Sequence, residues 1–185
     1  MSRPGLALCL LSACCALGCN DRSHTEAVDV ARPESRGPSL LEEGAYQHAF
    51  RQLSVRAGPD AEVLELDLQP HRIVLRARDP QMRERVLQHV FEGGKVQPPV
   101  PVRLLGTGTL EDNLFPMSEV TWAKVPGVAQ AAVKDVDPAS GRVSHVLVRR
   151  NLPHDSAVRI RAYVSSPIRD GYLDADARGN VLPGG

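Results

Sequence analysis

The sequence has no cysteine beyond residue 19. All four cysteines, at positions 9, 14, 15 and 19, lie in the first nineteen residues of the 185-residue chain. The remainder therefore holds no disulfide, no thiol nucleophile and no cysteine ligand for a metal. We expect its fold to be stabilised by packing alone, although disulfides are common in proteins outside the cytoplasm.

Aromatic residues are also scarce, and the chain has no net charge. Aromatic residues make up 4% of the chain, and 22 Lys and Arg residues balance 22 Asp and Glu residues. Proteins that bind nucleic acid combine a positive surface with aromatic rings on which bases stack. We therefore expect no nucleic-acid partner. The apolar 42% is mainly aliphatic and is sufficient for one ordinary core.

The N-terminal apolar run is too short to cross a bilayer. Gly5 to Gly18 contains fourteen uncharged residues behind Met1-Ser2-Arg3, whereas a spanning helix needs ~20. A short positive start before an apolar run of this length is typical of a secretory signal. We expect residues 1–18 to be a signal peptide.

The end of this run resembles the signal of bacterial lipoproteins, in which two small residues precede the lipidated cysteine. Ala16-Leu17-Gly18-Cys19 gives a signal of ordinary length, and Leu11-Ser12-Ala13-Cys14 fits the pattern better but gives a very short signal. We prefer Cys19 as the lipidated residue, with Cys14 as the alternative. The resemblance implies palmitate-type acylation and membrane attachment, since two or more chains anchor a protein stably. It also implies a cell-envelope location, with the outer membrane favoured, facing the periplasm or the exterior.

A polar segment follows the proposed anchor. Residues 19–38 are interrupted by Pro33 and Pro38 and show no apolar period. Such a composition cannot bury enough surface to offset the entropy of ordering. We expect a flexible tether that spans about 25 Å on average.

The remainder predicts an α+β fold made of two similar units, residues 39–97 and 117–185, joined by a linker at residues 98–116. In the first unit, Ser39-Leu40-Leu41-Glu42 has the pattern of a capping box ahead of a helix. Strands are expected over residues 62–69 and 72–78, from alternating apolar residues. Residues 85–91 are ambiguous, because Asp79-Pro80 also fits the start of a helix; the parallel with the second unit favours a strand.

The second unit repeats this order. Residues 117–136 are helix-like with a break near Pro126, and residues 137–141 form a turn. Strands are expected over residues 142–150, 157–164 and 171–177. Both units end in similar turns, Gly94-Lys95-Val96 and Gly179-Asn180-Val181. Two helix–β–β–β units predict an antiparallel sheet with helices on one face.

This order of elements is broadly similar to the PepSY-like and β-lactamase-inhibitor-like modules of exported bacterial proteins. The likeness covers Ser39 to Val181 as topology only. It implies a protein that binds, inhibits or helps to assemble other proteins.

Candidate chemistry is sparse, and we predict no catalytic residue, no metal site and no cofactor. His154-Asp155-Ser156 contains triad residue types, but neighbours in one loop cannot form the required line of nucleophile, base and orienting acid. Asp174 and Asp176 loosely resemble the opening of a calcium loop, without its closing glutamate. Gly106-Thr107-Gly108-Thr109 lacks the lysine of a phosphate-binding loop.

A binding surface is the best-supported prediction of function. On the strand at residues 157–164, Arg159, Arg161 and Tyr163 lie opposite the aliphatic side chains, and Arg149 ends the preceding strand. Arginine and tyrosine are enriched in the energetic centres of protein interfaces. We expect a non-catalytic module that binds another envelope protein. The alternatives are an envelope hydrolase with a site assembled from distant residues, and an inhibitor acting through the loop at residues 151–156 or 165–170.

Overall fold

The computed structural model describes residues 37–104 and 108–183. The predicted signal peptide, both candidate lipidation sites and nearly all of the predicted tether lie outside the described residues. In chain order the elements are α1 (Glu43–Ala57), β1 (Glu62–Gln69), β2 (Arg72–Asp79), β3 (Met82–Glu92), β4 (Lys95–Val96), β5 (Val100–Val102), α2 (Leu110–Asn113), β6 (Phe115–Pro116), two 3-10 turns, η1 (Met117–Glu119) and η2 (Trp122–Lys124), α3 (Val125–Val136), β7 (Arg142–Arg150), β8 (Val158–Ser165) and β9 (Gly171–Asp176).

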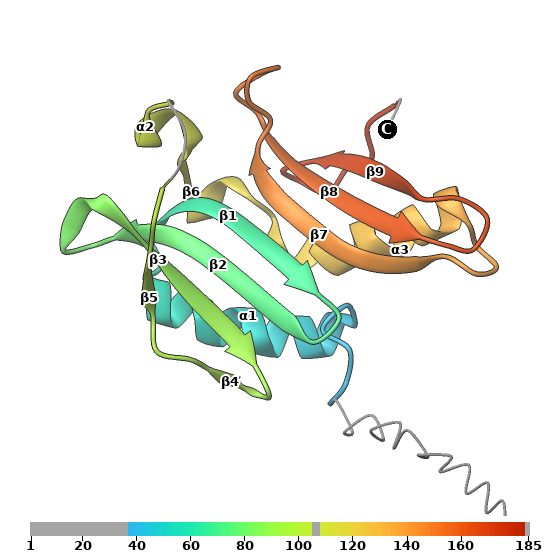
Figure 1. Ribbon diagram of the computed structural model, residues 1–185, viewed down its shortest axis with the longest axis horizontal. Coiled ribbons are helices and arrows are strands. Elements are labelled where there is room, and N and C mark those ends of the chain that lie inside the picture. Colours follow the sequence, from blue (N-terminus) through green and yellow to red (C-terminus); the bar gives the residue numbers. More distant parts are fainter. Residues whose placement is uncertain (1–36, 105–107, 184–185) are drawn as a thin grey trace, which may run out of the picture. The chain divides into compact units, whose positions relative to one another are not determined.

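The strands, which differ in length, form one antiparallel sheet. Their order is β4–β3–β2–β1–β7–β8–β9, with β5 paired to β3 and β6 paired to β1. At the centre β1 and β7 run antiparallel, with Leu66 opposite Val148 and Leu68 opposite Val146. Together with the helices this arrangement is the predicted α+β class (Figure 1).

Both long helices lie on one face of the sheet, where the core is buried. Helix α1 packs on β2, β3 and β4, and α3 packs on β7, β8 and β9 (Figure 1). The core contains Tyr46 and Leu53 from α1, Val128 and Ala132 from α3, and the alternate strand residues that face them. On β8 the alternation is strict: Val158, Ile160, Ala162 and Val164 are buried and the residues between them are not.

Residues 85–91 form a strand, so the preferred sequence interpretation is confirmed. The pairing of β3 with β2 extends from Met82 to Glu92. Asp79 does not start a helix here: its carboxylate accepts a hydrogen bond from the Gln81 amide (2.8 Å) in the turn that joins β2 to β3. An aspartate side chain that accepts a bond from a nearby backbone amide is common both at helix starts and in turns. Here the long pairing of β3 with β2 makes the segment a turn followed by a strand.

The capping-box prediction is wrong. Helix α1 begins at Glu43, after an N-cap residue, Glu42, that makes no side-chain capping bond. Leu40 is buried, and its amide donates to the Pro70 carbonyl in the β1–β2 turn (2.7 Å). The Ser39 hydroxyl instead accepts a hydrogen bond from the Leu41 amide (3.3 Å), in a turn that precedes the helix.

Residues 98–116, predicted to be a linker, contain short elements that join the sheet. Val100–Val102 pairs with β3, and Phe115–Pro116 pairs with the start of β1. Arg150 donates to the Leu114 carbonyl (2.9 Å), which fixes the end of this segment to β7. The expected break near Pro126 is confirmed: two 3-10 turns precede it, and Pro126 lies in the first turn of α3.

Candidate functional site

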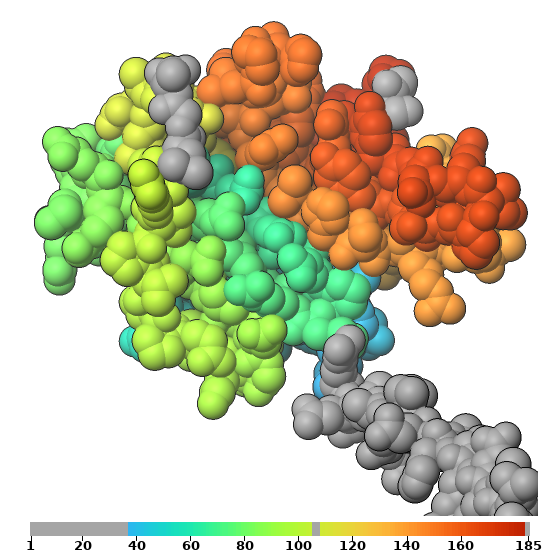
Figure 2. Space-filling view, in the orientation of Figure 1, coloured from blue at the N-terminus to red at the C-terminus, as the bar shows by residue number. Residues whose placement is uncertain are grey.

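The sheet face opposite α3 carries the residues that the sequence predicts for binding. We call this face of β7, β8 and β9 the open face. Arg159, Arg161 and Tyr163 alternate with the buried residues of β8 and therefore share it. Arg149 lies directly opposite Arg159 on β7. The four predicted residues are thus brought together on one surface, which faces the viewer in Figure 2.

The register adds an aromatic row that the sequence analysis missed. His145 of β7 lies opposite Tyr163 of β8, which lies opposite Tyr172 of β9. The His145 and Tyr163 rings are stacked with centroids 4.4 Å apart, and the Tyr172 ring is tilted at 6.0 Å from Tyr163. Contacts between aromatic rings on neighbouring strands stabilise the sheet. The alternation along each strand places His145, Tyr163 and Tyr172 on this face, but only the pairing register shows that the three are neighbours.

Arg161 is held by two partners. Its guanidinium donates two hydrogen bonds of 2.7 Å to the Asp174 carboxylate, and it lies 4.4 Å over the centre of the Tyr172 ring. The hydrogen bonds from Arg161 to Asp174 raise the pKa of the guanidinium above its ordinary value, so the side chain remains charged. Because the fork geometry of arginine matches a carboxylate, the side chain is fixed in one orientation.

Arg149 is less constrained than Arg161. Its guanidinium lies 4.0 Å from the Glu65 carboxylate, which already accepts a hydrogen bond of 2.6 Å from Arg76. The Arg149 side chain is 57% exposed, compared with 32% for Arg161. Among the predicted residues, Arg149 is therefore the cation most available to a partner.

Arg159 and the His154-Asp155-Ser156 loop form a structural unit. The Asp155 carboxylate accepts hydrogen bonds from the Asn151 side chain (3.0 Å), the Ala157 amide (2.9 Å) and Arg159 (2.9 Å). The bond from Asn151, followed by those from Ala157 and Arg159, holds the pKa of this carboxyl below its usual range. The carboxylate thus closes the loop between β7 and β8.

The two aspartates of the calcium-like stretch have different partners. Asp174 pairs with Arg161, and Asp176 accepts hydrogen bonds from the Arg178 amide and from the amide and side chain of Asn180. These bonds stabilise the turn after β9. In the part of the chain that the structure describes, no three His, Cys, Asp or Glu residues are grouped as metal ligands.

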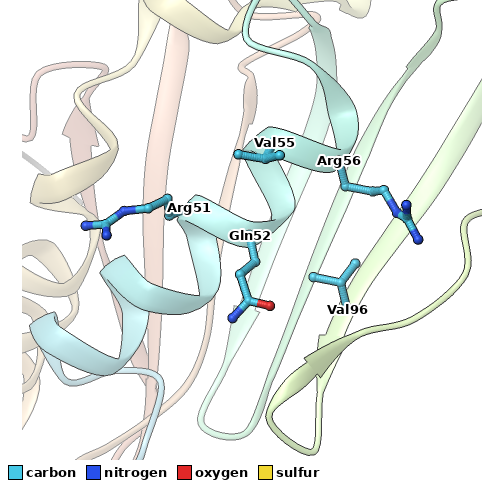
Figure 3. A pocket seen from close by; sticks show the side chains of 5 residues that line it. All are labelled: Arg51, Gln52, Val55, Arg56 and Val96. Atoms are coloured by element: carbon cyan, nitrogen blue, oxygen red, sulfur yellow. The ribbon is translucent and has the colours of Figure 1, made fainter.

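The opposite side of the molecule carries shallow grooves around α1. One lies between α1 and β4 and is lined by Arg51, Gln52, Val55, Arg56 and Val96 (Figure 3). A second, between α1 and η2, is lined by Tyr46, Gln47, Phe50, Arg51, Ser54 and Ala123. Among the described residues, neither groove has a histidine or a carboxylate in its lining, so these residues do not form an acid–base pair there.

The chain matches no protein-family model, no curated protein and no solved structure. Within the described residues, no helix combines the length and the apolarity that crossing a bilayer requires.

Proposed function

We propose that this chain is a lipid-anchored lipoprotein of the bacterial cell envelope that binds another envelope protein, without catalysis, through the open face. The observation that carries the binding proposal is the gathering of Arg149, Arg161 and Tyr163 on one sheet face that the helices do not cover. Arginine and tyrosine contribute strongly to protein interfaces. Arg161 is already fixed by Asp174, so binding orders little more of its side chain.

The attachment proposal depends on the sequence. The lipoprotein-like signal that ends at Cys19, or at Cys14, and the polar tether behind it support a protein held near a membrane. Such a tether keeps the binding domain at high local concentration next to other membrane-attached proteins. The outer membrane is our preferred location.

We also propose that the two halves are repeats of one helix–β–β–β unit. In each half a long helix precedes three antiparallel strands, and the first strands of the two halves, β1 and β7, pair at the centre of the sheet. Each unit alone is small for a stable core. Pairing β1 with β7 gives both units a shared, larger sheet.

Affinity capture of the anchored protein from membranes tests this proposal. We expect a co-purifying envelope protein that is lost with Arg149→Ala combined with Tyr163→Ala. It should be retained with Arg83→Ala combined with Lys134→Ala, two exposed cations on β3 and α3 that lie away from the open face. Mass spectrometry of the N-terminal peptide from the same sample identifies the acylated cysteine. Equal recovery from all three chains would contradict the role of the open face.

An inhibitor role is the second candidate, favoured by the loop at residues 165–170. Ile168 is 80% exposed at its tip. Ser166 accepts hydrogen bonds from the amides of Ile168 (3.2 Å) and Arg169 (3.0 Å), and Arg169 donates to the Val136 carbonyl at the end of α3 (2.8 Å). A protruding loop held in one shape is what an inhibitor presents to an enzyme. Under this alternative Ile168→Asp abolishes capture and the Arg149 and Tyr163 changes do not.

A further inference from the structure

The outer surface of α1 combines apolar atoms with cations. Val55 is 78% exposed in the last turn of this helix, beside the groove shared with Val96 (Figure 3). On the other side of the helix, Phe50 and Ala123 line the second groove, and Arg51 borders both. A helix face that exposes apolar side chains between arginines is typical of helices that lie in a membrane interface.

The two arginines on this surface have no acidic partner in the part of the chain that the structure describes. Among the described residues, neither Arg51 nor Arg56 forms a salt bridge. Within α1 the acidic residue is Glu43, in the first turn, which accepts a hydrogen bond from Gln47. Arg51 and Arg56 point to opposite sides of the helix (Figure 3). They are therefore not arranged to close on one small anion, and they suit an extended anionic surface.

We propose that this surface of α1 lies on the anionic headgroups of the membrane that anchors the chain, an inference that rests on the lipid anchor proposed above. The predicted tether leads to the N-terminal end of α1, where Leu40 is fixed to the β1–β2 turn. From Glu43 to Arg56 the helix extends about 20 Å. The tether averages about 25 Å, so the whole surface can reach the bilayer while the anchor stays inserted.

We expect the contact between α1 and the membrane to be strong enough to orient a tethered protein, but too weak to bring a free protein to the membrane. A basic side chain near an anionic membrane favours the bound state about fivefold, and two therefore favour it about 25-fold. A free protein is not held by so weak a contact. A protein that is already tethered is oriented by it, because the tether makes the second contact intramolecular.

This orientation leaves the open face free. The helices and the open face lie on opposite sides of the sheet. With α1 on the membrane, Arg149 and Tyr163 are turned away from the lipid, toward other proteins. The two surfaces thus divide the two tasks of membrane contact and partner contact.

The test uses the full lipidated chain in vesicles of phosphatidylglycerol and phosphatidylcholine, and in vesicles of phosphatidylcholine alone. A polarity-sensitive dye is attached at Val55→Cys in one sample and at Val100→Cys in the other. Val100, on β5, is 48% exposed and lies opposite Gln88 of β3, which lies opposite Arg76 of β2. These three residues are on the side of the sheet that faces away from α1. We expect a blue-shifted emission at position 55 in the anionic vesicles only, reversed by high salt, and no shift at position 100.

The charge dependence is tested with Arg51→Gln combined with Arg56→Gln. We expect this variant to lose the shift at position 55, and Arg83→Gln combined with Arg142→Gln to keep it. A chain that floats with both vesicles but shows equal emission at position 55 in each would overturn the membrane contact and leave the anchor intact. A chain that floats with neither vesicle would overturn the anchor and this inference together.

Discussion

The Arg161 guanidinium and the Asp174 carboxylate meet across β8 and β9 through two hydrogen bonds of 2.7 Å. Both side chains are largely shielded, and the Tyr172 ring lies against the guanidinium. This pair fixes the centre of the open face. It also connects the strand that carries the predicted binding residues to the last strand of the sheet.

A double-mutant cycle measures the strength of this pair. With Arg161→Ala and Asp174→Ala we expect a coupling of about 0.5–1 kcal/mol in the free energy of unfolding, because the pair is bidentate but still partly exposed. Arg159 and Asp155 form the control pair, with one hydrogen bond and a more exposed carboxylate. Urea unfolding of the six variants and the wild type gives both couplings. A coupling for Arg159 and Asp155 as large as that for Arg161 and Asp174 would contradict the geometric argument.

We expect His89 to make the stability of the protein depend on pH. It lies on the side of β3 that α1 covers, and its Nδ1 atom has no hydrogen-bond partner among the described residues. Burial lowers the pKa of the imidazole, Arg56 lowers it further, and Asp79 acts in the opposite direction. The unfolded chain therefore takes up a proton at higher pH than the folded chain does.

We expect the stability that depends on His89 to be complete above about pH 6.5 and to fall as the pH decreases through this value. The His89→Gln variant should have a flatter profile of unfolding free energy between neutral and mildly acidic pH. His48→Gln, at an exposed position on α1, should keep the wild-type profile. If both variants retain the slope of the wild type, the buried imidazole is not its source.

Gly179 is required by both its backbone and its surroundings. Its φ is +84°, and a Cβ atom there would lie 2.6 Å from Cβ of Lys124. We expect Gly179→Ala to lower the free energy of unfolding by about 1–3 kcal/mol, from backbone strain and the close contact. Gly44→Ala is the control, since it lies in α1 with open space around it. That substitution should raise stability by up to about 1 kcal/mol, as measured by thermal or urea unfolding.

The two candidate lipidation sites are distinguished by single substitutions. We expect Cys19→Ala to move the protein from the membrane fraction to the soluble fraction or to leave its signal uncleaved, because the acylated residue is lost. Cys14→Ala should leave attachment unchanged. Fractionation followed by mass spectrometry of the N-terminal peptide measures both. Release by Cys14→Ala with attachment retained in Cys19→Ala would reverse the assignment.

Local patterns in the sequence determined most of the strands. The alternation in Glu62–Gln69, Arg142–Arg150 and Val158–Ser165 marks both the strand and its buried side, because a strand with one buried face repeats every two residues. It therefore placed Arg159, Arg161 and Tyr163 on one face without any knowledge of their neighbours. The Arg178-Gly179-Asn180 turn was equally readable, since glycine supplies a positive φ.

Only the tertiary structure decided what pairs with what. Residues 85–91 fit a helix or a strand by themselves, and pairing with β2 and β5 makes them a strand. Val100–Val102 and Phe115–Pro116 are too short to show a period. The first pairs with β3 near the edge of the sheet, and the second pairs with the start of β1, beyond the residues that pair with β7. Tyr172 lies beside Tyr163, and Asp174 beside Arg161, because β9 pairs with β8 in this register. Register is set by contacts between segments, and no single segment carries that information.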